Sequence, residues 1–350
     1  MLRPALDSLI RQTHPAIEII FVDNGSTDKS VVVAEQMLSA QSRPFRIVNC
    51  VERGVNKARN YGYPFANGDY VQWMDADDAI DATKIALQVA ALEASPGFDV
   101  AYGDFTECFS IPNAPRAVRK RKLSQDKDQV FRALSGGWYP PHLYLLRRSA
   151  ADRLQQAQAW NSDCKVGTDR EYSCTAALMG MKFLHVPGAH VFYNIWSEGQ
   201  ISQRTAYGER VRSLEAIFGR LRSFVERTPA AAALTARHRV LLDQDWTIWT
   251  LPRGSVSIER LDGRRVRIRQ VQTGRTIEMR PREAATVRAI VEAGKAMATS
   301  HYALLLTGGS PPVDDPVLVI ETMQALRRAG FLVAVERGAG SAASGAATSS

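Results

Sequence analysis

Three carboxylates follow a short apolar segment of the chain. Residues 70–74 (YVQWM) are typical of a buried strand, and Asp75, Asp77 and Asp78 come directly after it. Neighbouring carboxylates repel one another and are costly to bury unpaired, so a hard divalent cation that prefers oxygen ligands would stabilise them. Such an ion completes its shell with substrate phosphates, and the cluster therefore indicates a site for a metal ion and a diphosphate. Taken alone, the motif also fits a solvated acidic turn.

A second polar loop follows another apolar segment. Residues 18–22 (EIIFV) predict a strand, and the loop after it begins with Asp23, Asn24 and Gly25. The alternation continues with a helix from residue 31, a strand at residues 46–50, a helix at residues 56–66 and the strand at residues 70–74. Alternating strands and helices predict a parallel sheet with right-handed crossovers. Asp23 and Asp75 would then leave the same edge, where such sheets bind ligands.

The segments around these loops resemble glycosyltransferase family 2, whose members have the GT-A fold. The matching segments, in the family's order and spacing, are EIIFVDNGSTDKS, ERGVNKARNYGYPFANGDYVQWMDADD and GTDREYSCTAALMGMKFLHVP. The resemblance covers about residues 1–205. It implies an α/β nucleotide-diphospho-sugar transferase, built as a Rossmann-like mixed sheet flanked by helices. The donor would be a nucleotide sugar.

The resemblance implies nucleotide-binding roles for the first two segments. Asp23 would contact the nucleobase, with Asn24 and Gly25 beside it in the same loop. Residues 53–60 (RGVNKARN) match a family block that would place Arg59 near the nucleotide. An ordinary ion pair, tying the helix of Arg59 to an acidic loop, is the alternative role for this side chain.

The resemblance also gives the acidic cluster a more specific role. The family's DxD-type carboxylates contact the ribose and a Mn²⁺ or Mg²⁺ ion on the diphosphate. These roles fall on Asp75 and Asp77, with Asp78 beside them as a further metal ligand. The predicted cofactor is therefore Mn²⁺ or Mg²⁺.

Residues 168–172 (TDREY) match the block that carries the family's catalytic base. The first acid of the usual Glu-Asp pair is replaced by Thr168, and the second is kept as Asp169. An inverting transfer needs a base that deprotonates the acceptor hydroxyl, and nearby carboxylates raise the pKa of such a base toward the useful range. Alternatively, Asp169 caps a helix at residues 171–179, and Glu171 is the base.

Two aromatic segments are further candidates. Residues 138–142 (WYPPH) lie in a Gly/Pro-rich loop that suits contact with a sugar or an acceptor, although a simple entry into a strand fits equally well. Residues 193–202 (YNIWSEGQIS) resemble a mobile family segment that closes over the donor. Trp196 could stack on a ring there, or anchor a surface loop.

The composition favours a cytoplasmic enzyme. The chain has 350 residues, 45% of them hydrophobic, and no apolar run approaches the roughly 20 residues of a membrane helix. The first residues predict an amphipathic helix rather than a signal peptide. The widely spaced cysteines, without a CxxC pair, suit reduced thiols; they are Cys50, Cys108, Cys164 and Cys174.

The net charge of +8 includes two basic regions, residues 116–122 and residues 253–282. Either could contact anionic lipid at the inner face of the membrane, nucleic acid or a polyanionic acceptor. A solvated surface is the commoner explanation of such runs.

The pattern changes after residue 225, which predicts a first domain at residues 1–225, a small α+β module at residues 226–337 and a disordered tail at residues 338–350. The module is expected to contain strands at residues 245–251, 255–261 and 264–271, helices at residues 281–292 and 314–329, an apolar segment at residues 301–306 and a strand at residues 331–335. In pattern it resembles a winged-helix or PqqD-like domain.

The sequence therefore predicts an inverting, metal-dependent glycosyltransferase. It would use a UDP-sugar, or a dTDP-sugar, and the hydroxyl of a glycan, lipid or peptide. One alternative is a catalytically inactive binding protein, favoured by Thr168 and by the absence of the family's first strand before Met1, which would leave an unpaired sheet edge. The other is a nucleic-acid-binding protein that acts through its basic carboxyl-terminal module. The acidic loops argue against nucleic acid.

Overall fold

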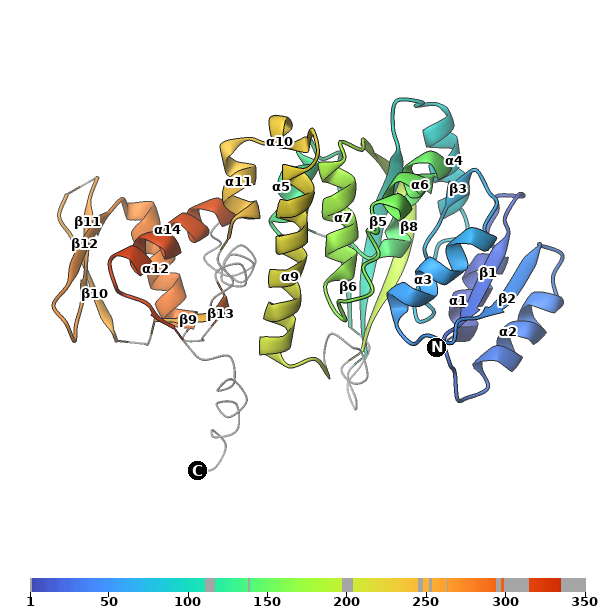
Figure 1. Cartoon of the computed structure of the whole chain (residues 1–350), viewed down its shortest axis with the longest axis horizontal. Coiled ribbons are helices and arrows are strands. Elements are labelled where there is room, and N and C mark those ends of the chain that lie inside the picture. The colour runs from blue at the N-terminus through green and yellow to red at the C-terminus, as the bar shows by residue number, and fades with distance from the viewer. Residues whose placement is uncertain are drawn as a thin grey trace. The chain divides into compact units, whose positions relative to one another are not determined.

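The chain divides into two compact units in the computed structural model, which describes residues 2–110, 117–137, 139–196, 204–244, 248–251, 254–262, 264–293, 297–298 and 315–334. The first unit comprises residues 1–133 and 138–204, and the second comprises residues 134–137 and 205–350 (Figure 1). Helix α9 (Tyr207–Glu226) belongs to the second unit, where it contacts α10 (Ala230–Ala233) and α11 (Ala236–Leu242). The second unit therefore resumes at residue 205, before the boundary expected at residue 225, because α9 packs with the helices that follow it.

The first unit begins with a small parallel sheet. Strand β1 (Ile19–Asp23) pairs with β2 (Phe45–Asn49), as the alternation of strands and helices predicted. Helices α1 (Leu2–Ile10) and α2 (Ser30–Ser39) share an apolar cluster with one face of this sheet. Among the described residues β1 has one strand neighbour, β2, so its other edge is unpaired.

Helix α3 (Val55–Gly62) contacts β1. The contact is close at Gly62, where an added Cβ would lie 2.6 Å from Cγ2 of Val22. A larger residue at this position would push α3 away from β1. The 3₁₀ turn η1 (Tyr63–Phe65) continues from the end of α3.

A second, six-stranded sheet forms the centre of the first unit. Its order is β3-β7-β5-β8-β4, with β6 paired to β5. The strands are β3 (Tyr70–Val71), β4 (Ala79–Ile80), β5 (Val100–Ser110), β6 (Ala117–Arg121), β7 (Leu145–Arg147) and β8 (Phe183–Trp196). Strands β5 and β8 are parallel, whereas the other pairs are antiparallel. The strands of this sheet are mixed in direction, as the resemblance implied. The prediction that the strand before Asp75 lies in one parallel sheet with the strand before Asp23 was wrong, because β3 lies in this second sheet and pairs with β7, a strand of opposite direction.

Helices and turns cover this sheet and carry part of the site. They are α4 (Lys84–Glu93), α5 (Gln129–Leu134), η2 (Pro141–Leu143), α6 (Arg148–Gln156) and α7 (Thr168–Leu178). Helix α4 packs against β5 and β8, and its Leu92 lies in a core with Ala101, Leu145 and Ala189. No described helix is both long enough and apolar enough to cross a membrane.

Within its described residues, the second unit contains two antiparallel three-stranded sheets. One is β10 (Val256–Arg260), β11 (Val266–Gln270) and β12 (Thr276–Met279), and the other is β13 (Met297–Ala298), β9 (Ile248–Thr250) and β14 (Val333–Ala334). Helices α12 (Pro281–Ala293) and α14 (Pro316–Arg328) share their core, with Ile268, Val287 and Met323 among its buried residues. Strands lie within each of the predicted ranges 245–251, 255–261, 264–271 and 331–335, whereas β12 and β13 were not predicted. The predicted apolar segment at residues 301–306 and the tail at residues 338–350 lie outside the described residues.

Candidate active site

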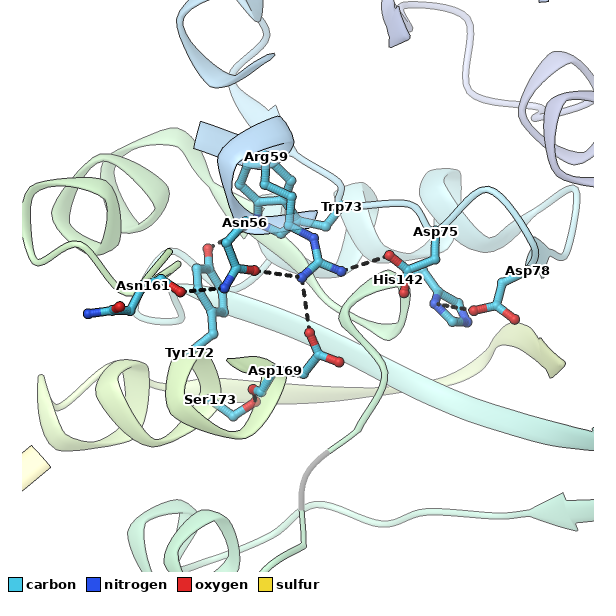
Figure 2. A network of polar contacts seen from close by, with 10 residues as sticks. All are labelled: Asn56, Arg59, Trp73, Asp75, Asp78, His142, Asn161, Asp169, Tyr172 and Ser173. Atoms are coloured by element: carbon cyan, nitrogen blue, oxygen red, sulfur yellow. Dashed lines mark hydrogen bonds and ion pairs between the residues drawn. The ribbon is translucent and has the colours of Figure 1, made fainter. Parts of the chain in front are cut away.

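Arg59 on α3 joins two acidic segments of the first unit (Figure 2). Its Nη2 lies 2.7 Å from Oδ1 of Asp75, and its Nη1 lies 3.1 Å from Oδ1 of Asp169. Its side chain is only 10% exposed, whereas those of Asp75 and Asp169 are 27% and 31% exposed. The structure therefore brings together three of the residues that the sequence singled out.

Packed aromatic rings lie against the Arg59 guanidinium. Its Cζ lies 4.0 Å from the centroid of the Trp160 ring, a cation–π contact. Trp160 stacks on Tyr172 with centroids 4.1 Å apart, and Trp73 meets both rings edge-on while its Nε1 donates to the Tyr172 hydroxyl at 3.1 Å. Because these rings are packed against one another, they hold the guanidinium in the position that reaches both carboxylates.

Asp169 lies inside the first turn of α7. The helix begins at Thr168, after Gly167 with φ of +79°, and no side chain caps it. The alternative in which Asp169 caps a helix that starts at residue 171 was therefore wrong, because the helix already begins at Thr168. The Asp169 carboxylate contacts Arg59 instead. Glu171 is buried and is not among the groups that Arg59 contacts.

The environment of Asp169 suits a proton acceptor. Burial raises the pKa of Asp169 above the ordinary carboxyl value, the positive charge of Arg59 opposes this, and the negative charge of Asp75 adds to it. With part of the side chain exposed, the carboxylate is both desolvated and reachable. A raised pKa makes a carboxylate a better base near neutral pH.

Asp75, Asp78 and His142 form the candidate metal site. Each offers one ligand atom, and these atoms lie within 4.8 Å of one another. Nδ1 of His142 lies 3.3 Å from Oδ2 of Asp78, and the two side chains are 0% and 2% exposed. Neither ring nitrogen of His142 has a hydrogen-bond partner among the described residues.

The chemistry of these three side chains fits a divalent cation. Burial lowers the pKa of His142 to about 4, so the imidazole is neutral, the form that binds metals. Burial also raises the pKa of Asp78 to about 9, and nearby Asp77 and Asp75 contribute to that shift. A buried carboxyl group and an unpartnered imidazole are each costly alone, and a cation between them would satisfy both.

The end of β8 fixes the acidic loop. The backbone N–H of Asn194 donates to Oδ1 of Asp78 at 2.7 Å, and its side-chain Nδ2 donates to the backbone oxygen of Asp77 at 2.6 Å. The Asp77 carboxylate lies outside the group formed by Asp75, Asp78 and His142. Of the three predicted metal ligands, the structure thus groups two, and it adds a histidine that the sequence assigned only to a sugar or acceptor loop.

The predicted nucleobase loop is tied to the start of α3. Oδ1 of Asp23 accepts from the backbone of Ser26 at 3.0 Å. The Asn24 amide donates to the carbonyl groups of Cys50 and Glu52 at 2.9 and 2.7 Å and accepts from the N–H of Gly54 at 2.7 Å. The Gly25 carbonyl accepts from Arg53 at 3.2 Å. Asn24 therefore shapes the loop, and α3 links it to the Arg59 contacts.

The remaining aromatic candidates are only partly described. The Tyr139 ring stacks on the Tyr102 ring, with the two centroids 6.1 Å apart. Cζ of Arg132 lies 4.4 Å from the centroid of the Tyr139 ring. Trp196 is the last residue of β8, opposite Ser110. Residues 197–203, which include most of the predicted closing segment, and residue 138 lie outside the described residues.

Comparison with a solved structure identifies the fold. Staphylococcus aureus TarS 1–349, solved in complex with UDP-GlcNAc, superposes with a TM-score of 0.51 at 16% identity, over 69% of this chain and 66% of that one. At this identity the likeness shows the fold, which is the GT-A glycosyltransferase fold.

Sequence comparison agrees with the resemblance found in the sequence. Residues 1–155 match the Glycosyl transferase family 2 model. An uncharacterized glycosyltransferase of Nostoc sp. is 30% identical over 188 residues, covering 51% of this chain and 56% of the relative. The minor teichoic acid biosynthesis protein GgaB of Bacillus subtilis is 39% identical over 217 residues, covering 59% of this chain and 23% of that protein. The matched part of this chain thus spans about half the length of the Nostoc relative and less than a quarter of the length of GgaB.

Proposed function

We propose that this protein transfers a sugar from a UDP-sugar to an acceptor hydroxyl with inversion at the anomeric carbon. The observation that carries the proposal is the Arg59 bridge, which holds a carboxylate of the candidate metal site and the candidate base on two sides of one guanidinium. The TarS complex with UDP-GlcNAc supports UDP as the first nucleotide to test.

Asp75, Asp78 and His142 would hold Mn²⁺ or Mg²⁺, with Asp77 as the neighbouring carboxylate. When bound, the ion supplies Lewis-acid stabilisation of the negative charge on the departing diphosphate. Arg59 lies beside this cluster and contributes a positive charge that persists throughout the physiological pH range. Its contacts with Trp160 and with both carboxylates keep that charge in place as substrates enter.

Asp169 would act as the general base. Its carboxylate takes the proton from the acceptor hydroxyl while the oxygen attacks the anomeric carbon from the face opposite the diphosphate. The bond between the anomeric carbon and the diphosphate oxygen breaks, its electron pair stays on the nucleotide, and the configuration inverts. Asp169 then releases its proton to solvent, which the exposed part of its side chain permits.

A panel of UDP- and dTDP-sugars tests this proposal. Donors are first found from the melting temperature of the protein with Mn²⁺, because a ligand that binds only the native state raises it. Release of the nucleotide from the best donor is then followed with Mn²⁺ and with EDTA. We expect metal-dependent release. Binding without any release, across a range of acceptors, would contradict catalysis and favour a binding protein.

A further inference from the structure

Two polar side chains lie on the buried face of α4. The buried residues of this helix are Lys84, Ile85, Gln88 and Leu92, and both Lys84 and Gln88 are 0% exposed. Lys84 forms no ion pair with a described residue. A lysine is almost never fully buried unless it is paired, because its charge is costly to remove from water. A side chain that breaks the apolar pattern of its helix in this way is a candidate for a functional role.

The Lys84 amine holds the side-chain amide of Gln72 in one orientation. Its Nζ donates to Oε1 of Gln72. Nε2 of Gln72 donates to the backbone oxygens of Trp73, at 2.6 Å, and His142, at 3.1 Å. The reversed amide would place its oxygen against these two carbonyl oxygens, so the amide oxygen must face the amine. Burial lowers the pKa of Lys84 well below the ordinary lysine value, and a neutral amine can still donate to Gln72.

Gln72 joins the two segments that carry the candidate metal ligands. It precedes Asp75 by three residues, and one carbonyl that it binds is that of His142 in η2. Among the described residues, neither ring nitrogen of His142 has a hydrogen-bond partner. The position of the imidazole, 3.3 Å from Asp78, therefore depends on the backbone of η2 and on packing (Figure 2).

Helix α4 contacts η2 a second time, through Gln88. Nε2 of Gln88 donates to the backbone oxygen of Leu143 at 3.0 Å. This contact reaches the residue after His142, whereas the contact of Lys84 passes through Gln72 to His142 itself. Burial is the main cause of the lowered pKa of His142, and a charge on Lys84 would lower it further. The amine therefore lies within electrostatic range of the imidazole.

We propose that Lys84 is a positioning residue of the candidate metal site, and that it acts through Gln72 on the turn that carries His142. The inference rests on the metal site of the proposed function and requires neither a donor nor sugar transfer. The amine fixes the Gln72 amide, the amide fixes the carbonyl of His142, and the turn then holds the imidazole beside Asp78. Loss of a group that orients a metal ligand typically weakens metal binding roughly 10–100-fold. A contact that stabilises the core alone would leave metal binding unchanged.

The test measures binding of Mn²⁺ alone to the full chain by electron paramagnetic resonance, together with the melting temperature. The variants are Lys84→Met, Gln72→Met and the double variant. Methionine is similar in length to both residues but donates no hydrogen bond. The matched control is Gln88→Met, which makes the same change on the same face of α4. It breaks the contact with Leu143 and leaves the bond between Gln72 and His142 intact.

We expect Lys84→Met to bind Mn²⁺ roughly tenfold more weakly, the lower end of the range for such groups. Its melting temperature should stay near that of the parent, because removal of an unpaired buried amine offsets the lost hydrogen bond. Gln72→Met should lose at least as much affinity. The double variant should bind like Gln72→Met, since Lys84 acts on the site only through that amide and the two losses are not additive. Gln88→Met should bind Mn²⁺ like the parent.

Parental Mn²⁺ affinity in Lys84→Met would overturn the proposal, and so would a loss in the double variant beyond that of Gln72→Met. An equal loss in Gln88→Met would show that any loosening of η2 weakens the site, which would overturn the specific role of Lys84. If Lys84→Met does not fold, Lys84→Leu, which also lacks a donor, is measured against the same criteria.

The absence of a donor from this assay separates the inference from the proposed function. A parent that binds Mn²⁺ with the expected dependence on Lys84, but transfers no sugar, would support the inference and contradict the proposed transfer alone. Parental affinity in Lys84→Met beside metal-dependent transfer would contradict the inference alone. A parent that binds no Mn²⁺ would contradict both.

Discussion

Asp169 and Arg59 lie 110 positions apart in the chain and form an ion pair of 3.1 Å. The same guanidinium lies 2.7 Å from Asp75, which belongs to the candidate metal site. The candidate base and the candidate metal site therefore share one guanidinium. Loss of the acceptor oxygen of either residue would release one side of Arg59, whereas an amide in its place would keep that contact.

The first prediction concerns the base. Asp169→Asn keeps an oxygen that can accept from Arg59 but removes the proton acceptor, so donor binding should be nearly unchanged. Turnover should fall roughly 10²–10⁴-fold, the usual contribution of a positioned acid–base group. Nucleotide release and donor affinity are measured in parallel. Glu171→Gln, a matched change two residues along α7, should retain turnover. Parental turnover in Asp169→Asn would move the role to another group.

The second prediction concerns pH. Asp169 is active only when deprotonated, and burial together with Asp75 raises its pKa in the folded protein against the opposing charge of Arg59. As the pH falls, turnover should therefore decline at a pH above that at which an ordinary aspartate, with a pKa of about 3.9, becomes protonated. The measurement is kcat/KM for donor turnover between neutral and acidic pH, with melting temperature recorded at each point. A rate that stays constant down to the ordinary aspartate range would be inconsistent with a raised pKa.

The third prediction concerns the metal ligands. His142→Ala removes the only nitrogen ligand of the candidate set, and binding of Mn²⁺ alone, followed by electron paramagnetic resonance, should weaken at least about tenfold. Asp78→Asn should have a comparable effect. Asp77→Asn tests the predicted ligand that the structure leaves outside the group, and we expect a smaller loss. Mn²⁺ affinity that is unaffected by His142→Ala would exclude the imidazole from the site.

The fourth prediction concerns stability. Arg59→Lys keeps the charge but cannot reach both carboxylates with a fixed fork of donors, so it should lower the free energy of unfolding by about 1–3 kcal/mol. Urea unfolding measures this difference. The control is Lys57→Gln on the same helix, which removes an ion pair with Glu52 between side chains that are 38% and 72% exposed. Such a surface pair contributes little to stability, because solvent screens it. Equal losses in the two variants would show that the Arg59 bridge is no stronger than a surface contact.

Local patterns in the sequence were sufficient to predict much of the first unit. The strands predicted before Asp23 and Asp75 and the helix predicted around Arg59 are all present, as β1, β3 and α3. Each depends on residues that are close together in the chain. The apolar face of the first helix was likewise predicted, and Leu2, Leu6 and Leu9 pack in one cluster.

The partners of these residues could not be predicted in the same way. His142 meets Asp78, and Trp160 lies under Arg59, only because tertiary packing brings separate segments together. The Pro-Pro pair before His142 was a usable signal for a rigid turn, η2, but not for what that turn faces. The direction of β3 was also missed, because two paired residues carry too little pattern to specify their neighbour.

The proposed function requires the acidic cluster to form a metal-dependent nucleotide site joined to the candidate base through Arg59. Calorimetric titration of the protein with UDP, once with Mn²⁺ and once with EDTA, measures this requirement. We expect saturable binding with Mn²⁺ and a loss of at least about tenfold in affinity with EDTA, since unscreened carboxylates repel the diphosphate. Equal affinity for UDP under the two conditions would exclude such a site.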